Sequence, residues 1–190
     1  MMKIPTFQTA RLILRELVET DAAAYERHFV DYNVIRNLTA LVPWPYPKDG
    51  VIEYLRTYVI PNQGQDKWVW AIALKESPGE LIGAIDLWRD GKPENRGFWL
   101  GHAFWGRGYM TEAVEPITDY AFGQLGFEKL VFTNAVGNPR SRRVKEKMGA
   151  RLVGRAPARF VDPALTEHEI YELRKNEWIE LQRIRDPKDR

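Results

Sequence analysis

Hydrophobic positions along the chain follow two patterns, short runs that are typical of strands and wider spacings that are typical of amphipathic helices. Several of the runs are hydrophobic at consecutive positions, so both faces of the resulting sheet are expected to be covered. The triplet Ser77-Pro78-Gly79 predicts a turn that joins two strands into a hairpin. The seven predicted strands are Leu12–Leu17, Trp68–Leu74, Leu81–Trp88, Arg96–His102, Lys129–Thr133, Arg151–Val153 extending onward, and His168–Arg174.

Four helices are predicted between the strands, over residues 20–30, 51–59, 107–122 and 138–149. Thr20 and Asp21 offer N-caps to the first helix, and Pro61 is expected to end the second. Pro116 lies inside the third, where it removes one backbone hydrogen bond and is expected to kink the helix. Because strands and helices interleave along the chain, the expected class is α/β or α+β, with helices packed on a sheet.

The length and composition of the chain indicate the number of domains and exclude several kinds of functional site. The chain has 190 residues, of which 44% are hydrophobic, and we expect one domain over 1–190, with a core at 9–178 and a charged tail at 179–190. The absence of cysteine excludes disulfides, a thiolate nucleophile and cysteine-ligated metals. Three scattered histidines argue against a histidine metal cluster. No apolar run approaches the ~20 residues of a membrane span, and a cytoplasmic location is expected.

A glycine-containing segment, Trp105–Ala113, lies between a predicted strand and a predicted helix. Glycines at such a junction let the backbone turn tightly and direct N–H groups to one point, where the helix N-terminus favours an anion such as a phosphate. The segment is neither a Walker loop nor a complete G-x-G-x-x-G motif. The alternative is a tight strand-to-helix turn without a ligand.

A second segment, Asn138–Arg143, opens the next predicted helix. Asn138 could cap the helix or hold a ligand amide, and Ser141 lies three residues further at the same end. A plain N-cap is the alternative to a ligand contact.

The two segments in this order resemble the GNAT superfamily of acyl-CoA N-acyltransferases, and most closely its Rim-type branch, which contains the ribosomal-protein N-terminal acetyltransferases. The resemblance spans Thr9 to Trp178. It is carried by Thr9–Arg15, Leu81–Gly83, Gly106–Ala113, Asn138–Ser141, Met148-Gly149 and Tyr171–Leu173. It implies a mixed, mostly antiparallel central sheet of about seven strands, about four helices on both faces, and a V-shaped opening between strands 4 and 5.

The resemblance also implies acetyl-CoA as the cofactor and a set of binding residues. The segment Trp105–Met110 would wrap the CoA pyrophosphate, although Trp105 and Met110 depart from the family pattern at its first and last positions. Asn138 would bind the pantetheine arm, and Ser141 would lie near the sulfur. The implied cofactor-binding residues are Trp99, Leu100, Gly101, Gly106, Arg107, Gly108, Tyr109, Met110, Thr111, Asn138, Ser141 and Arg143.

The implied chemistry is the direct attack of a neutral primary amine on a thioester, which needs a base for the amine and an acid for the thiolate. Ser141 is the candidate acid, because no tyrosine follows on its helix. Asp86 is the candidate base, because it interrupts an apolar strand, and a structural ion pair is the alternative. Glu112 and His102 are weaker choices.

For the acceptor, the loop at residues 38–47 is rich in proline and aromatic residues, and Trp44, Tyr46 and Trp88 are the candidate contacts. The acceptor is a protein N-terminus or a small-molecule amine. Weak ribosome association and a homodimer are further expectations. The alternatives are a catalytically inactive CoA-sensing or protein-binding module and a nucleic-acid-binding protein.

The formal net charge of +2 conceals an uneven distribution. Between Asn138 and Phe160, only Glu146 opposes a group of basic side chains, which is expected to serve in part as an anion-binding surface. The group consists of Arg140, Arg142, Arg143, Lys145, Lys147, Arg151, Arg155 and Arg159.

Overall fold

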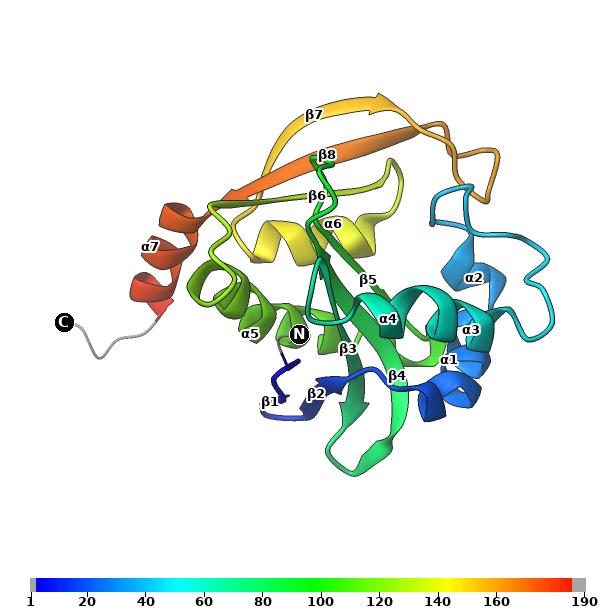
Figure 1. Ribbon diagram of the computed structural model, residues 1–190. Coiled ribbons are helices and arrows are strands. Elements are labelled where there is room, and N and C mark those ends of the chain that lie inside the picture. The colour runs from blue at the N-terminus through cyan, green and yellow to red at the C-terminus, as the bar shows by residue number, and fades with distance from the viewer. Residues whose placement is uncertain (1–2, 186–190) are drawn as a thin grey trace.

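The computed structural model describes residues 3–185, which fold into two antiparallel sheets with helices on both sides (Figure 1). The first sheet has the order β1-β2-β3-β4-β5 and the second the order β6-β8-β7. The strands are β1 (Phe7–Gln8), β2 (Leu12–Glu16), β3 (Lys67–Leu74), β4 (Ser77–Trp88), β5 (Arg96–Leu100), β6 (Lys129–Ala135), β7 (Arg151–Pro157) and β8 (Glu167–Arg174).

The helices follow the predicted order with several additional short segments. A 3-10 turn at Glu19–Asp21 precedes the first helix, a π-helical segment at Leu55–Val59 joins the third to the fourth, and a 3-10 turn at His102–Phe104 follows β5. The helices are α1 (Ala22–Phe29), α2 (Tyr32–Ile35), α3 (Gly50–Tyr54), α4 (Ile60–Asn62), α5 (Tyr109–Gly123), α6 (Pro139–Lys147) and α7 (Lys175–Arg185).

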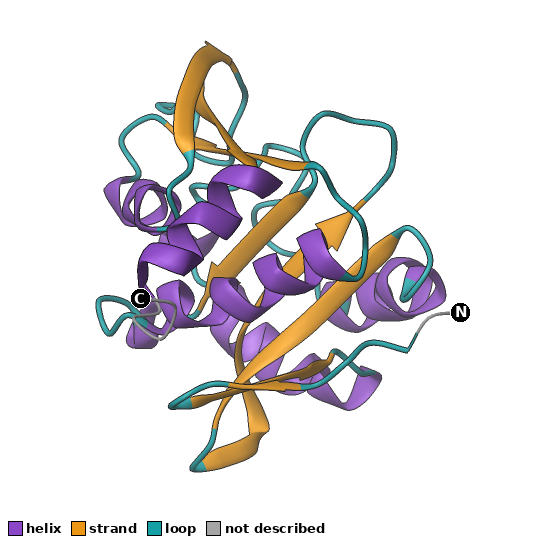
Figure 2. Cartoon of the chain, turned by 90° about the vertical axis from the view of Figure 1, so that its left-hand side faces the viewer, coloured by secondary structure: helices purple, strands orange, loops and turns teal. Residues whose placement is uncertain are grey.

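The first sheet separates two hydrophobic cores, as the apolar runs on both of its faces predict. One core joins the sheet to α5, α6 and α7 and includes Trp70, Ile117 and Trp178. The other joins the sheet to the helices between β2 and β3 and includes Phe29 and Leu55. Figure 2 shows the helices and the strands between them from the side. The mostly antiparallel mixed fold and the V-shaped opening are therefore confirmed, since the fourth predicted strand, β5, and the fifth, β6, belong to different sheets.

Several predicted boundaries are wrong for local reasons. The triplet at Ser77 does not form the turn but begins β4, and the chain reverses at Lys75-Glu76; Pro78 is tolerated because it lies near the end of the strand, beside a shift in register. Pro61 does not end its helix at once, because it lies inside α4, which continues directly from the π-helical residues and ends one residue later at Asn62. The Asp21 side chain does not cap α1 but accepts a hydrogen bond from the N–H of Val18.

Three further boundaries change at the ends of elements. β5 ends at Leu100, two residues earlier than predicted, and α5 begins at Tyr109 rather than Arg107. The predicted charged tail is helical as far as Arg185, because Trp178 in α7 is buried in the core; residues 186–190 lie outside the described part. Pro116 lies inside α5 as predicted. Within residues 3–185, no helix combines the length and the apolar character that a membrane span requires.

Candidate active site

The opening between the two sheets begins at Asn95, directly before β5. The backbone N–H of Asn95 donates to the carbonyl oxygen of Val131 at 3.1 Å, and its Oδ1 accepts from the N–H of Val131 at 2.9 Å. Beyond this bridge, β5 and β6 are not paired. A cavity of about 630 Å³ lies here, lined by residues of both strands, α5, α6 and two distant loops.

The cavity brings together most of the residues that the sequence pointed to. The predicted residues that do not line it are Trp44, Tyr46, Asp86, Gly101 and Arg107. Those that do are Trp88, Trp99, Leu100, Gly106, Gly108, Tyr109, Met110, Thr111, Asn138, Ser141 and Arg143.

The segment between β5 and α5 has the backbone conformation that its glycines allow. Gly106 and Gly108 have φ angles of 76° and 80°, in the left-handed region that disfavours other residues. The N–H groups of the first turn of α5 have no partners inside their own helix, and the α5 N-terminus borders the cavity through Gly108, Tyr109 and Met110. Trp105 anchors the segment by donating its Nε1–H to the carbonyl oxygen of Leu100 at 2.7 Å. This geometry can bind a phosphate through backbone amides.

Arg11, at the start of β2, fixes the same segment from outside the cavity. It donates to Glu112 through Nε at 2.7 Å and to the carbonyl oxygen of Arg107 through Nη1 at 2.9 Å, and its guanidinium lies over the Tyr109 ring. Thr9 also donates to Glu112. Burial raises the pKa of Glu112, but the hydrogen bonds from Thr9 and Arg11 together lower it by more, so the pKa lies below its usual value. Glu112 is therefore a structural carboxylate here.

At the start of α6, the side chain of Asn138 caps the helix. Its Oδ1 accepts from the N–H of Ser141 at 3.3 Å. The Ser141 hydroxyl is also occupied, because its Oγ accepts a hydrogen bond of 2.6 Å from Nζ of Lys145, one turn along the helix. Lys145 is buried, and burial followed by the charge of Arg96 lowers its pKa well below the usual value. The Lys145 side chain thus places a basic nitrogen with a lowered pKa at hydrogen-bond distance from Ser141.

Asp86 forms the ion pair that was the alternative to its role as base. Its carboxylate lies 2.8 Å from Nζ of Lys67, whose ammonium group also lies over the rings of Tyr58 and Trp88. The side chain lies beside Gly97, where an added Cβ would come within 2.7 Å of Oδ1. Asp86 is thus held behind β5 and does not line the cavity.

The aromatic loop at residues 38–47 contributes its beginning rather than its aromatic side chains. Tyr46 packs against Phe29 in the second core, and Trp44, whose peptide bond to Pro45 is cis, is 43% exposed and contacts Tyr32. Neither side chain lines the cavity. The cavity is instead bordered by Asn37, Leu38 and Thr39 of this region.

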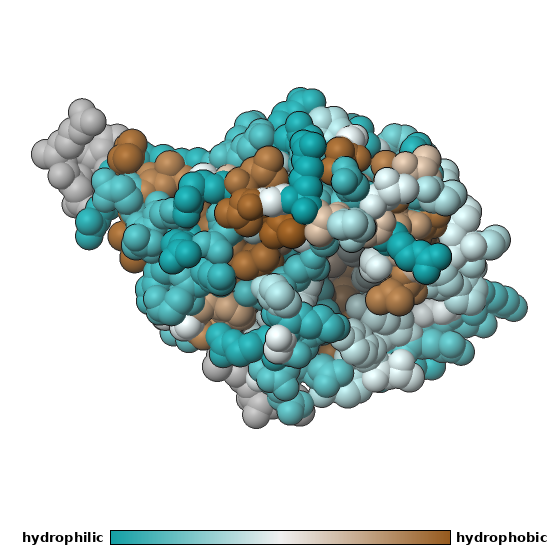
Figure 3. Space-filling model, turned by 90° about the horizontal axis from the view of Figure 1, so that it is seen from above, coloured by the Kyte–Doolittle hydropathy of each residue, from teal (hydrophilic) through white to brown (hydrophobic). Residues whose placement is uncertain are grey.

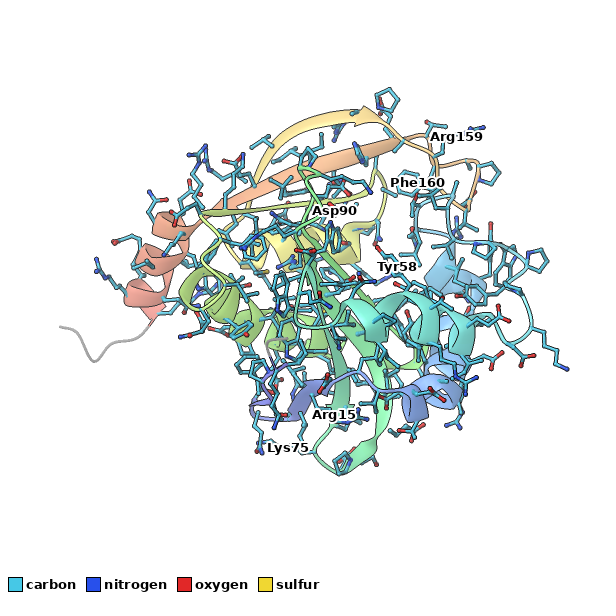
Figure 4. All side chains as sticks on the ribbon, in the orientation of Figure 1. Arg15, Tyr58, Lys75, Asp90, Arg159 and Phe160 are labelled. Carbon is cyan, nitrogen blue, oxygen red and sulfur yellow. The ribbon has the colours of Figure 1, made fainter. Side chains whose placement is uncertain are left out.

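The segment after α2 is joined to the connection between β7 and β8, a contact between loops that are far apart in the sequence. Val161 donates its N–H to Leu38 and Ala40 donates to Arg159, at 3.0 and 2.9 Å, and Arg36 pairs with Asp162. Arg159 and Phe160, labelled in Figure 4, extend from this connection and line the cavity. We call residues 36–40 with 158–162 the loop bridge. The sequence did not predict the loop bridge, because neither loop has a pattern that indicates which other segment it contacts.

Charge in the cavity is strongly positive. Glu94 is the single acidic residue among those that line it, and it lies 3.9 Å from Nδ1 of His168. Other members of the predicted basic group are paired elsewhere: Arg142 and Arg155 with Glu169, and Arg151 with Glu177. The basic residues that line the cavity are Arg96, Arg140, Arg143, Lys145, Lys147 and Arg159. The surface of the molecule seen from above is otherwise a mixture of hydrophilic and hydrophobic side chains (Figure 3).

This arrangement fits a polyanionic cofactor with a neutral, extended arm. The start of α5 and six basic side chains border the opening, and the walls between the strands are largely aromatic, with Phe98, Trp99 and Phe132. Among residues 3–185, no group of three or more potential ligands could hold a metal ion.

Comparisons with known proteins place these features in a family. Residues 11–151 match the model of the acetyltransferase (GNAT) domain. YdaF of Bacillus subtilis (strain 168), whose name describes a ribosomal N-acetyltransferase, is 32% identical over 104 residues, which are 53% of this chain and 57% of YdaF. The chain therefore spans somewhat more than half the length of this relative.

Solved structures give the same overall fold. A crystal structure from T. thermophilus, described as an acetyltransferase, superimposes with a TM-score of 0.75 at 26% identity, covering 97% of each chain. The microcin C7 self-immunity acetyltransferase MccE, solved in complex with acetyl-CoA and AMP, has a TM-score of 0.71 at 18% identity and covers 87% of this chain and 93% of its own.

Proposed function

We propose that this chain, which belongs to the GNAT family of acetyltransferases, transfers the acetyl group of acetyl-CoA directly to a primary amine in a ternary complex. The membership confirms the resemblance that the glycine segment and the Asn138 segment carried, and the YdaF match agrees with the Rim-type branch. The observation that carries the proposal is the cavity between β5 and β6, where a helix N-terminus, free backbone amides and a cluster of cations meet.

In this proposal the pyrophosphate binds the amides at Gly106–Met110. Arg140, whose guanidinium lies 4.1 Å from the centre of the Trp105 ring, and Arg143, which also lines the cavity, are the proposed side-chain contacts to the phosphates. The pantetheine arm runs along the unpaired edge of β5. Because the N–H of Gly101 is bonded to Ile82 in β4, strand alternation directs the N–H of Leu100 towards the opening. That N–H is the proposed donor to the thioester carbonyl, where negative charge develops during the attack.

The amine nitrogen attacks the thioester carbon, a C–N bond forms, and the C–S bond breaks. Ser141 donates its hydroxyl proton to the leaving thiolate, and Lys145, bonded to Ser141 Oγ at 2.6 Å, replaces that proton. The amine must lose a proton before it attacks. With Asp86 engaged by Lys67, the groups proposed to receive it are Glu94 and His168, which line the cavity close to the loop bridge.

The acceptor enters beside Trp88 and the loop bridge in this proposal. Both acceptor classes, a protein N-terminus and a small-molecule amine, fit an amine nitrogen presented to the thioester. The ribosomal name of YdaF supports the first class, and the closure of one side by the loop bridge supports a narrow acceptor. Ribosome association and a homodimer stay predictions.

The test is acetyl-CoA turnover, read as release of free CoA thiol, against a panel of peptides with free N-termini, amino acids, polyamines and aminoglycosides. Calorimetric binding of acetyl-CoA is measured in parallel. Turnover with a subset of amines is expected, and it identifies the acceptor class. Binding without turnover on any amine would instead support the CoA-sensing alternative, and absence of binding would remove the cofactor assignment.

A further inference from the structure

Arg96 is a buried cation without a carboxylate partner among the described residues. It is the first residue of β5, is 4% exposed and lines the cavity. The guanidinium lies 3.9 Å from the centre of the Phe132 ring, and Nη1 contacts the sulfur of Met148. Its Nε–H and Nη2–H groups have no hydrogen-bond partner. Burial lowers the pKa of Arg96 to about 9, against the opposing effect of Asp86, so the group keeps its charge at neutral pH.

Lys145, in α6, is a second buried basic side chain that lines the cavity. It is 1% exposed and has Ser141 Oγ as its hydrogen-bond acceptor. The Arg96 guanidinium and the Lys145 ammonium lie 5.5 and 5.2 Å from the centre of the Phe98 ring. Burial and then the charge of Arg96 lower the pKa of Lys145. The two basic groups therefore occupy one small, aromatic-lined region.

The nearby acidic residues are engaged with other bases. Glu169 binds Arg142 and Arg155, Asp86 binds Lys67, and Glu94 lies 3.9 Å from Nδ1 of His168. A buried charge without a counter-charge is costly, because it has lost its hydration without gaining a partner. An anion in the cavity would supply the missing counter-charge. Rings of Phe98, Phe132 and Tyr171 surround the cations, and such a setting suits a compact monoanion that accepts two parallel hydrogen bonds from a guanidinium.

We propose that Arg96 and Lys145 form a subsite for a carboxylate group on the reactant that lies next to the thioester. The inference rests on the proposed function and extends it to the class of acyl donor. The contact between Lys145 and Ser141, the residue proposed to lie near the sulfur, favours a carboxylate on the acyl group, as in malonyl-CoA or succinyl-CoA. A carboxylate on the acceptor amine has the same chemistry and is the other source.

The transfer balances in the same way for an acyl group that ends in a carboxylate. The amine forms the C–N bond, the C–S bond breaks, one proton leaves the amine and one reaches the thiolate. The distal carboxylate keeps its charge and its bonds throughout. No oxidant, reductant or additional reactant is needed.

The first experiment measures binding by calorimetry and does not depend on turnover. Succinyl-CoA is compared with butyryl-CoA, which has the same number of acyl carbons and no charge. The wild type is expected to bind succinyl-CoA about tenfold more tightly, which corresponds to ~1.4 kcal/mol. Arg96→Met and Lys145→Met remove this preference, whereas Arg183→Met, the same kind of change on an exposed side chain of α7, keeps it. Equal binding of the two donors by the wild type would contradict the acyl-group source.

The second experiment tests the acceptor source, with acetyl-CoA as the donor and pairs of amines that differ by a carboxylate or its amide. The quantity compared is the ratio of turnover with the carboxylate amine to turnover with its amide. If Arg96→Met changes this ratio but does not change the preference for succinyl-CoA, the carboxylate belongs to the acceptor. If neither arm depends on Arg96, the subsite is wrong. Turnover with acetyl-CoA would then still support the proposed function. Conversely, an Arg96-dependent preference in binding without thiol release on any amine would keep the subsite and contradict the enzyme.

Arg96→Met is expected to fold, because it replaces an unpaired buried charge with an apolar side chain of similar length. Its melting temperature is expected to equal or exceed that of the wild type. A large decrease would show that Arg96 serves packing, and the Lys145→Met comparison then decides whether the succinyl-CoA preference exists apart from the fold.

Discussion

The Nη2 atom of Arg11 lies 2.7 Å from Oε2 of Glu112, and this contact joins the first long strand of the main sheet to the first turn of α5. Arg11 also reaches the carbonyl oxygen of Arg107, so one side chain positions both ends of the glycine segment. The Thr9–Arg15 motif of the sequence thus has a physical role in holding the segment that is proposed to bind the cofactor.

Replacement of Arg11 by Met is expected to weaken CoA binding, because the amides of the glycine segment lose their fixed orientation. Because the Arg11 side chain is 47% exposed, its replacement should lower the free energy of unfolding by no more than ~1 kcal/mol. The loss of CoA affinity, measured by calorimetry, should correspond to a larger free energy than this. Arg27→Met removes a similar exposed pair with Glu80 and should leave CoA binding unchanged. Equal CoA affinities of Arg11→Met and wild type would contradict this role.

Gly108→Ala is expected to lower both the melting temperature and the CoA affinity. The φ angle of 80° at Gly108 costs a residue with a Cβ ~1–2 kcal/mol. Gly79→Ala is the matched control, because Gly79 has no left-handed conformation and an added Cβ meets nothing within 4 Å. Thermal unfolding with and without CoA measures both effects. A Gly108→Ala protein as stable as the Gly79→Ala protein would refute the conformational argument.

Ser141→Ala is expected to lower kcat about 10²-fold or more, the scale of a lost general acid, with little change in CoA affinity. Steady-state kinetics with calorimetry separate the two quantities. Ser77→Ala, at an exposed position in β4, controls for the loss of a hydroxyl. An unchanged kcat would place the acid elsewhere.

The lowered pKa of Lys145 predicts that the free energy of unfolding depends on pH and rises as the pH rises. Its folded-state pKa is lowered by burial and by Arg96, while Glu169 and Glu94 act in the opposite direction. Between the lowered pKa and the unfolded value of about 10.5, the unfolded chain binds more protons, so the free energy of unfolding rises with pH. Denaturant titrations from about pH 7 to pH 10 should show a larger rise for the wild type than for Lys145→Met. Parallel curves would show that Lys145 is not desolvated as described.

Trp178 predicts that α7 contributes to the stability of the domain. The side chain is 2% exposed and donates its Nε1–H to Asp119 at 2.7 Å. Trp178→Ala should cost ~3–5 kcal/mol, measured by denaturant unfolding. Ile184→Ala, in the same helix at 68% exposure, should cost less than ~0.5 kcal/mol. A small effect of Trp178→Ala would mean that α7 is not firmly docked.

The sequence predicted the elements whose signals are local. The apolar strands β3 and β4 and the helix α5 with its glycine start required only periodicity and turn residues. The errors arose where tertiary packing decided the outcome. Trp178 draws a charged segment into a helix on the core, and Ser77-Pro78-Gly79 is used as the start of a strand.

For the site, sequence reasoning found the glycine segment and α6 but not the residues that distant segments bring to them. Arg96 alternates with Phe98 and Leu100 along β5, so its inward direction could have been derived from strand periodicity. Lys145 lies four residues after Ser141 and next to Val144, on the buried side of α6. Lys145 was predicted only as one of the basic residues between Asn138 and Phe160, and Arg96 only as the first residue of a strand, because a count of charges does not show which of them have partners.

The Asn95 bridge and the loop bridge together set the route by which a reactant can reach the thioester. Asn95 ties β5 to β6 at the base of the opening, and the loop bridge joins the two halves of the molecule a second time. The two bridges tie distant segments together at two places, and separating these segments there would break backbone hydrogen bonds. Under the proposed function, this constraint favours an acceptor whose reactive amine stands at a terminus.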